Sequence, residues 1–212
     1  MGGDIINLPG LAAICKRYGA RLMVDDAHSI GVLGPTGAGT AEHFGVTDDI
    51  DLIMGTFSKS FAALGGFIAG KKEVIEFIQH TARSLIFSAS ITPSSAAAVL
   101  TALDIIEAEP ERREHLWYNA RKIQREFRSL GFDIGHTATP IVPIVVGQDL
   151  DTFAFWKDVY DRGVFTNPVI SPAVAPGRAM IRTSYTATHT DAHLDKVIEV
   201  MAEVGRKRGL IS

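Results

Sequence analysis

Short apolar segments that alternate with helix-forming segments constrain this chain most. Residues 21–24 and 51–54 are largely apolar runs bounded by charged or small residues, and residues 66–70 form a third. Apolar residues with helical spacing precede the first run over residues 8–18 and stop at Gly19, which suits a helix C-cap. Alternation of this kind predicts an α/β domain with a mostly parallel sheet.

After residue 70 the chain is first mainly helical, and beyond residue 130 strands and helices alternate again. Residues 72–83 predict a helix with Val74, Ile75, Phe77 and Ile78 facing inward, and further helices follow Pro93 and span residues 111–130. Beyond them, strands are predicted over 141–146, 164–166 and 180–185, and helices over 152–162 and 191–208. This pattern predicts a small α+β domain over residues 108–212, after an α/β portion over residues 1–107.

Composition narrows the class of protein. A net charge of −3 gives no reason to expect nucleic acid or an anionic membrane as a partner. No run of about 18 apolar residues predicts a transmembrane helix, and the start of the chain does not resemble a signal peptide. One cysteine, Cys15, lies in an apolar helical segment, which favours an inert thiol in a reducing compartment. We therefore expect a cytoplasmic protein.

Two predicted strands are followed by side chains with complementary chemistry. Asp25 and His28 follow the strand at 21–24, and Thr56, Ser58 and Lys59 follow the strand at 51–54. An amine, a carboxylate and an imidazole at strand ends suggest a pyridoxal phosphate site without a metal, because ligands of open α/β sheets bind there. Lysine would form the imine and act as base, aspartate would keep the ring nitrogen protonated, histidine would bond the ring hydroxyl, and the hydroxyls would take phosphate.

Each of these residues also has an ordinary interpretation. A lysine in a Gly/Ser loop is usually a solvated surface residue, and an aspartate can cap a turn. His28 alone could equally be a packed, hydrogen-bonded histidine. An α/β binding domain that does not use pyridoxal phosphate would, however, leave the combination of Asp25, His28 and Lys59 unexplained.

Longer motifs resemble a known family. The runs DDAHSIGVLGPTGAG over residues 25–39, GTFSKSFAALGG over 55–66 and RAMIRTSYTATHT over 178–190 resemble the α-oxoamine synthase family. The resemblance implies a pyridoxal phosphate enzyme of fold type I that condenses an amino acid with an acyl-CoA and loses carbon dioxide. It also implies that Arg182 binds the substrate carboxylate, a role that suits a guanidinium fork.

The resemblance further implies a homodimer with its active site at the subunit interface. Ser88, in the run IFSAS over residues 86–90, matches the segment that reaches the phosphate of the neighbouring subunit's cofactor. Ala89 and Ile170 depart from the pattern, since relatives often carry a polar residue at the first position and some carry an arginine at the second.

Within the family, residues 83–90 and 107–113 look most like the bacterial serine palmitoyltransferase branch, which implies L-serine and a fatty acyl-CoA as substrates. The glycine C-acetyltransferase and 8-amino-7-oxononanoate synthase branches share every motif and remain alternatives. The chain matches only the C-terminal part of the family pattern, without the glycine-rich phosphate turn and the ring-stacking histidine. We expect little turnover from this portion alone, and an inactive fragment or dimer partner is the alternative of another class.

Overall fold

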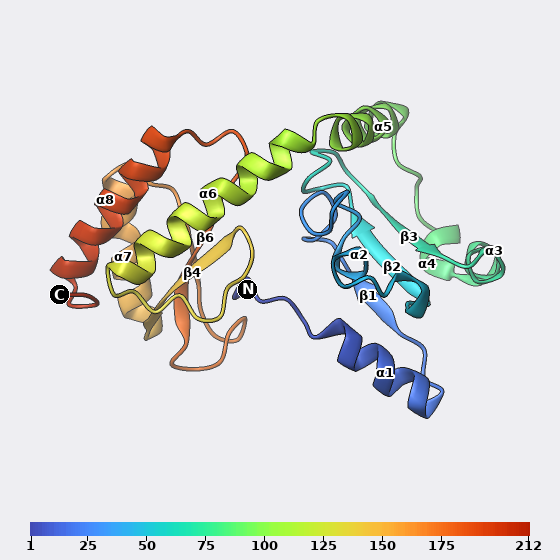
Figure 1. Cartoon of the computed structure of the whole chain (residues 1–212), viewed down its shortest axis with the longest axis horizontal. Coiled ribbons are helices and arrows are strands. Elements are labelled where there is room, and N and C mark those ends of the chain that lie inside the picture. Colours follow the sequence, from blue (N-terminus) through green and yellow to red (C-terminus); the bar gives the residue numbers. More distant parts are fainter. The chain divides into compact units, whose positions relative to one another are not determined.

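The computed structural model describes all 212 residues and divides them into two compact units. The N-terminal unit comprises Ile6–Arg113. The C-terminal unit comprises Glu114–Ser212 together with Met1–Ile5. The change from one unit to the other falls inside a long helix, α6 (Pro110–Ser129), which Figure 1 shows in yellow-green.

The N-terminal unit is built on a three-stranded sheet of order β1-β2-β3. Its elements in chain order are α1 (Leu8–Tyr18), β1 (Met23–Asp25), α2 (Thr40–Phe44), the 3-10 turn η1 (Thr47–Asp49), β2 (Leu52–Thr56), β3 (Gly66–Gly70), α3 (Lys72–Thr81), α4 (Arg83–Ile86) and α5 (Pro93–Ala108). The predicted α/β class is confirmed, but the sheet is mixed. β1 and β2 are parallel, whereas β3 runs antiparallel to β2, because the connection over residues 57–65 is too short for a crossover.

Local signals explain where α1 begins and ends. The Asn7 side chain accepts a hydrogen bond from the N–H of Gly10 at 3.2 Å. Pro9 lies in the first turn, where its missing N–H costs no hydrogen bond within the helix. Gly19 ends the helix in the left-handed region, with φ 62°. Leu8 on this helix packs with Val24 of β1 and with α2 in a small core. Cys15 is half-buried on the same helix.

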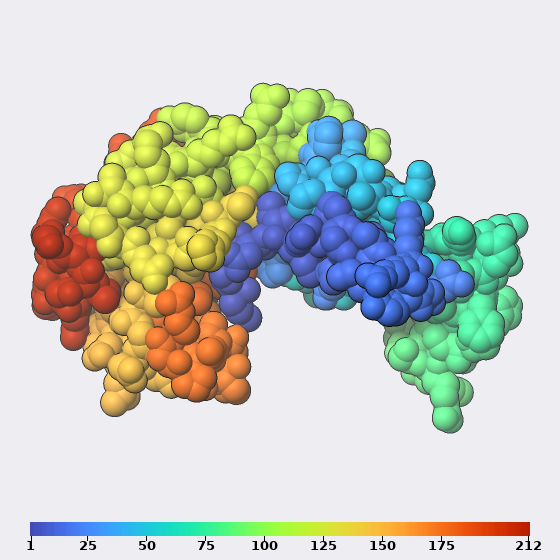
Figure 2. Space-filling model, turned by 60° about the horizontal axis from the view of Figure 1, so that its bottom comes forward, coloured from blue at the N-terminus to red at the C-terminus, as the bar shows by residue number.

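The apolar side of α3 is only partly covered. The prediction that Val74, Ile75, Phe77 and Ile78 face inward is wrong for Val74 and Phe77, which are 38% and 67% exposed, whereas Ile75 and Ile78 are half-buried. The apolar pattern exists, but β3 and α4 cover it only in part, and no residue of α3 is fully buried. α5 likewise buries no residue, although its sequence is strongly apolar. Figure 2 shows α3 and α4, in teal to green, projecting from the rest of their unit.

The C-terminal unit is a second three-stranded sheet with helices packed on it, which confirms the predicted α+β character. Besides α6, it contains β4 (Ile141–Gly147), α7 (Asp149–Asp161), β5 (Asn167–Val169), β6 (Ala179–Ser184) and α8 (Asp191–Lys207). The strand predicted at 164–166 is wrong, because the Thr166 carbonyl accepts the indole N–H of Trp156 at 3.1 Å and the strand begins only at Asn167.

Strand order in this sheet is β4-β6-β5, with both pairs antiparallel. Both edge strands carry a proline: Pro143 of β4 pairs with Arg182, and Pro168 of β5 pairs with Ile181. The core of the unit joins apolar side chains of all three long helices to the sheet, among them Ile123, Phe127, Ile144, Phe155, Ile181, Leu194 and Met201.

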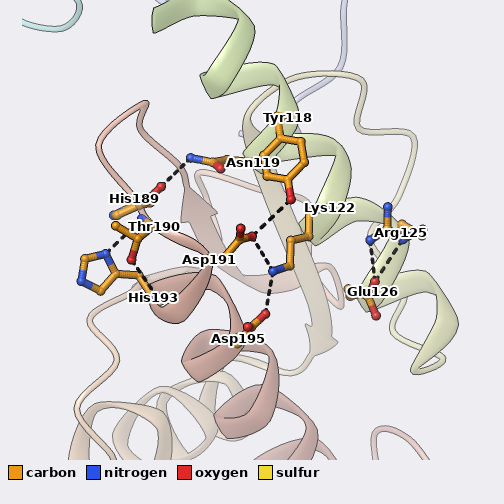
Figure 3. A network of polar contacts seen from close by, with 10 residues as sticks. All are labelled: Tyr118, Asn119, Lys122, Arg125, Glu126, His189, Thr190, Asp191, His193 and Asp195. Atoms are coloured by element: carbon orange, nitrogen blue, oxygen red, sulfur yellow. Dashed lines mark hydrogen bonds and ion pairs between the residues drawn. The ribbon is translucent and has the colours of Figure 1, made fainter.

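A polar network joins α6 to the start of α8 (Figure 3). The Lys122 ammonium lies 2.7 Å from Asp191 and 2.6 Å from Asp195, and these carboxylates raise the pKa of Lys122. Buried Asn119 donates to the carbonyls of Thr186 and His189 at 2.9 and 3.0 Å. The network therefore fixes the loop that follows β6. No helix in either unit has the length and apolarity that crossing a membrane requires.

Candidate active site

Two loops of the N-terminal unit meet at one edge of its sheet. Asp25 ends β1 and pairs in register with Met54, while Thr56 ends β2 two residues further on. The parallel pairing continues past β1, since the N–H of Asp26 donates to the Met54 carbonyl at 2.8 Å. Because the two strands are parallel, the segments after Asp25 and after Thr56 leave the same edge.

The first loop carries the predicted acid and imidazole. Asp25 is exposed, and one of its carboxylate oxygens accepts the N–H of Ala27 at 3.0 Å. The N–H groups of Ser29 and Ile30 donate to the Asp26 carbonyl at 2.9 and 3.1 Å, which closes a turn. His28 lies on this turn and is exposed. The loop thus presents the carboxylate and the imidazole to solvent a few residues apart.

Asp26 has the opposite environment from its neighbour. It is 1% exposed, and its carboxylate accepts the backbone N–H of Thr40 at 2.9 Å and lies 2.5 Å from the Thr40 hydroxyl. A Cβ at Gly39, which has φ 106°, would lie 2.4 Å from the same carboxylate. Asp26 therefore fastens the far end of the loop at the start of α2, while Asp25 stays available.

The second loop, residues 57–65, carries the predicted amine. The Thr56 hydroxyl lies 2.9 Å from the Ser58 hydroxyl and donates to the Gly65 carbonyl at 3.2 Å. The N–H of Ala62 donates to the Lys59 carbonyl at 2.9 Å, and Ala62 adopts φ 49°, a strained conformation for a residue with a Cβ. Lys59 is exposed and its ammonium pairs with no carboxylate. An unpaired amine flanked by hydroxyls lies in this loop.

Ser88 lies apart from these two loops, after α4. It is exposed, and its hydroxyl donates to the Ser84 carbonyl at 2.5 Å. This local bond occupies the hydroxyl hydrogen, so the hydroxyl must turn away from Ser84 to donate to an anion.

Arg182 belongs to the C-terminal unit. It lies on the central strand β6, opposite Pro143 on one side and Asn167 on the other. Its Nε is buried without a hydrogen-bond partner, and burial lowers the pKa of the guanidinium from its usual value. A buried donor without a partner is costly, so an anion that accepts from this group would be stabilised.

Sequence reasoning missed the residues that hold these loops in place: Asp26, Glu42 and Ser60. The alternation of side chains along a strand could have separated Asp25 from Asp26, since successive residues face opposite sides. Glu42 follows a glycine-rich loop at the start of a helix, but its partners are set by the tertiary fold. No group of three or more His, Cys, Asp or Glu side chains is placed to hold a metal ion.

The fold and the two motif loops define a family. The chain belongs to the aminotransferase class I and II family, whose model matches residues 1–201.

Individual relatives narrow the similarity. A serine palmitoyltransferase from Sphingobacterium spiritivorum is 54% identical over 171 residues, which cover 81% of this chain and 43% of that protein. An 8-amino-7-oxononanoate synthase from Petrotoga mobilis is 42% identical over 80% of this chain and 43% of its own length. The chain thus spans less than half the length of these curated relatives.

Solved structures show the same architecture. A high-resolution structure of SPT with a PLP internal aldimine superposes with a TM-score of 0.95 at 34% identity, over 99% of this chain and 53% of that chain. The serine palmitoyltransferase of Sphingomonas wittichii superposes with the same TM-score of 0.95 at 31% identity, over 100% of this chain and 54% of that chain. The predicted fold class, a portion of the fold type I architecture, is confirmed.

Proposed function

We propose that the complete protein is a pyridoxal phosphate-dependent acyltransferase that joins L-serine to an acyl-CoA. The products would be a 3-keto amine, free CoA and carbon dioxide. The observation that carries this proposal is that Asp25 and Lys59 follow adjacent parallel strands at one sheet edge. The serine palmitoyltransferase from Sphingobacterium spiritivorum, 54% identical over 81% of this chain, supports the choice of substrates.

The residues at this edge fit the cofactor by their chemistry. When bound, pyridoxal phosphate supplies an electron sink for charge that develops at the α-carbon of an amino acid. The exposed Lys59 amine would attach covalently and later move a proton at that carbon. The Asp25 carboxylate would hold the ring nitrogen protonated, and His28 would bond the ring hydroxyl. The Thr56 and Ser58 hydroxyls, 2.9 Å apart, would bind phosphate.

Substrate and partner follow from residues outside the two loops. The unpartnered Nε of Arg182 supports binding of the amino-acid carboxylate, to which a guanidinium donates two parallel hydrogen bonds. Ser88 would reach the phosphate bound by a second copy of the protein in a homodimer. The exposed apolar residues of α3 and α5, such as Phe77 and Leu100, support burial of this region in an assembly. The single cysteine favours the cytoplasm.

A second acyl transfer fits the same residues. The 8-amino-7-oxononanoate synthase similarity, 42% identity, supports a different amino acid and acyl-CoA at the same site. Glycine C-acetyltransferase chemistry would use the same groups. An inactive dimer partner would have no need of the unpaired Lys59 amine, so we favour an enzyme.

Covalent trapping tests the proposal. The complete protein is incubated with pyridoxal phosphate and reduced with borohydride, and the modified peptide is mapped by mass spectrometry. We expect the adduct on Lys59, its loss in Lys59→Ala, and its retention in Lys196→Ala, a change at another exposed lysine. An adduct at a different lysine in the unmodified protein contradicts the mechanism.

The choice between substrates needs a second measurement. Absorbance changes of the bound cofactor with serine, glycine or alanine, followed by CoA release with added acyl-CoA, separate the alternatives. A response to serine alone supports the palmitoyltransferase reaction, and a response to alanine or glycine alone replaces it with one of the other two.

A further inference from the structure

The loop over residues 30–40, which we call the brace loop, contacts the loop over residues 57–65 next to Lys59. We call this second loop the lysine loop. The Ser60 hydroxyl donates to the Ile30 carbonyl, a bond between residues 30 positions apart. Gly31 has φ 80°, and a Cβ there would lie only 2.8 Å from the Ser60 Cβ. A glycine is therefore required at this position twice over, by its backbone conformation and by the close approach of Ser60.

The brace loop is itself held from its outer side. The Glu42 carboxylate accepts the Thr36 hydroxyl at 2.7 Å, the Thr36 N–H at 3.2 Å and the Ala38 N–H at 3.0 Å. The Arg113 guanidinium donates to the Pro35 carbonyl at 2.7 Å. Within the loop, the N–H of Gly31 donates to the Gly37 carbonyl at 2.7 Å. These bonds leave the Ile30 carbonyl little freedom to move.

The ionisation state of Glu42 is consistent with this role. Burial raises the pKa of the carboxyl, but the hydrogen bonds from Thr36 and Ala38 and the charge of Arg113 lower it below its usual value. Glu42 is therefore an anion at neutral pH, and a carboxylate accepts these three bonds more strongly than a neutral group does.

We propose that Ser60 is a positioning residue for Lys59, and that Glu42 acts on Lys59 through the brace loop and Ser60. Asp25 and His28 lie just before the brace loop in the same continuous segment. One set of bonds therefore fixes the lysine loop relative to the segment that carries Asp25 and His28. Besides the Ser60 bond, the lysine loop is held at its two ends, by the Thr56 hydroxyl on the Gly65 carbonyl and by the stacking of Phe57 on Phe67. The Ser60 bond is the one that ties the residue after Lys59 to the brace loop.

The first test needs no cofactor. Hydrogen exchange of the amides in residues 57–65 is measured on the complete protein, where the N–H of Ala62 is hydrogen-bonded. We expect about five-fold faster exchange in Ser60→Ala, as for loss of one ordinary hydrogen bond, and recovery in Ser60→Thr. Glu42→Gln should accelerate the same amides from a distance. Unchanged exchange in Ser60→Ala overturns the proposal.

A matched control separates this effect from a general loss of stability. Ser129 makes the same kind of bond, from its hydroxyl to the Glu126 carbonyl at 2.8 Å, in the C-terminal unit. Ser129→Ala should leave the exchange of residues 57–65 unchanged. An equal acceleration in Ser129→Ala shows that the Ser60 result is not positional and overturns the proposal.

The second test rests on the proposed function. The rate of borohydride-trappable attachment of pyridoxal phosphate, and the pH at which the bound chromophore changes its absorbance, are compared between the natural protein and Ser60→Ala. We expect attachment about ten-fold slower and a shifted pH midpoint, because Lys59 is no longer oriented. If the natural protein attaches the cofactor at Lys59 and Ser60→Ala matches it in both measurements, the positioning role is wrong. If the natural protein attaches nothing at Lys59, the proposed function is wrong, and the hydrogen-exchange comparison alone decides the positioning role.

Discussion

Asp25 and Asp26 are adjacent in sequence, and their removal should have opposite consequences. Asp26→Ala leaves the buried Thr40 N–H without its acceptor, at a cost of about 1–3 kcal/mol, and removes a charged partner from the Thr40 hydroxyl. That hydroxyl keeps Ser29 Oγ at 2.9 Å, so the second loss is partial. We expect the N-terminal unit to lose about 3 kcal/mol of stability. Asp25→Ala removes an exposed bond to Ala27, and we expect a loss under about 1 kcal/mol.

The assay must report the N-terminal unit alone. Both tryptophans, Trp117 and Trp156, lie in the C-terminal unit, so their fluorescence cannot serve. Hydrogen exchange of peptides from residues 23–56 at rising urea gives the required free energy, and tryptophan fluorescence then acts as the internal control. Borohydride trapping of pyridoxal phosphate should show the reverse order. Per folded molecule, Asp25→Ala should form less trapped adduct than Asp26→Ala. Equal destabilisation by the two substitutions refutes the assignment of one aspartate to structure and the other to chemistry.

Three further predictions concern pH and packing. Burial raises the pKa of Glu42, but the hydrogen bonds from Thr36 and Ala38 and the charge of Arg113 lower it below its usual value. The stability that ionised Glu42 contributes is therefore complete above about pH 4.5 and is lost as pH falls through the lowered pKa. Glu42→Gln should remove this pH dependence of stability in urea titrations. Burial lowers the pKa of His189, so NMR should find its titration below pH 6.5. Because the fold favours the neutral ring, the protein should lose stability as pH falls from 6.5 through the lowered pKa. Phe155→Ala, in the core at 0% exposure, should cost about 3–5 kcal/mol by tryptophan fluorescence in urea, against under about 0.5 kcal/mol for Leu150→Ala at 82% exposure.

Local patterns predicted the elements that depend on local physics. The helix over 8–18 follows from its apolar spacing and from Gly19, and the observed bounds are Leu8–Tyr18. The direction of β3 depends on how a short connection closes. The exposure of α3 depends on what other chain segments cover it. The strand at 164–166 was lost to a side-chain bond from Trp156. None of these tertiary factors leaves a periodic signal in the sequence.

The same distinction applies to the site. Asp25, His28 and Lys59 could be proposed from residue chemistry and motif resemblance, and the parallel register explains why their loops share an edge. The supporting residues could not be proposed in this way. The Ser60 hydroxyl meets a carbonyl 30 positions earlier, and serine is common in loops of every kind. Only the tertiary structure distinguishes Ser60 from its neighbour Ser58.

The prolines on both outer strands of the C-terminal sheet have a consequence for association. A proline lacks the N–H that an added strand would need, so Pro143 and Pro168 hinder further strands from joining either edge. The outer strands of the N-terminal sheet, β1 and β3, carry no proline. Strand addition between unfolding molecules should therefore begin at the N-terminal sheet, and aggregation seeds recovered from heated protein should be enriched in residues 23–25 and 66–70.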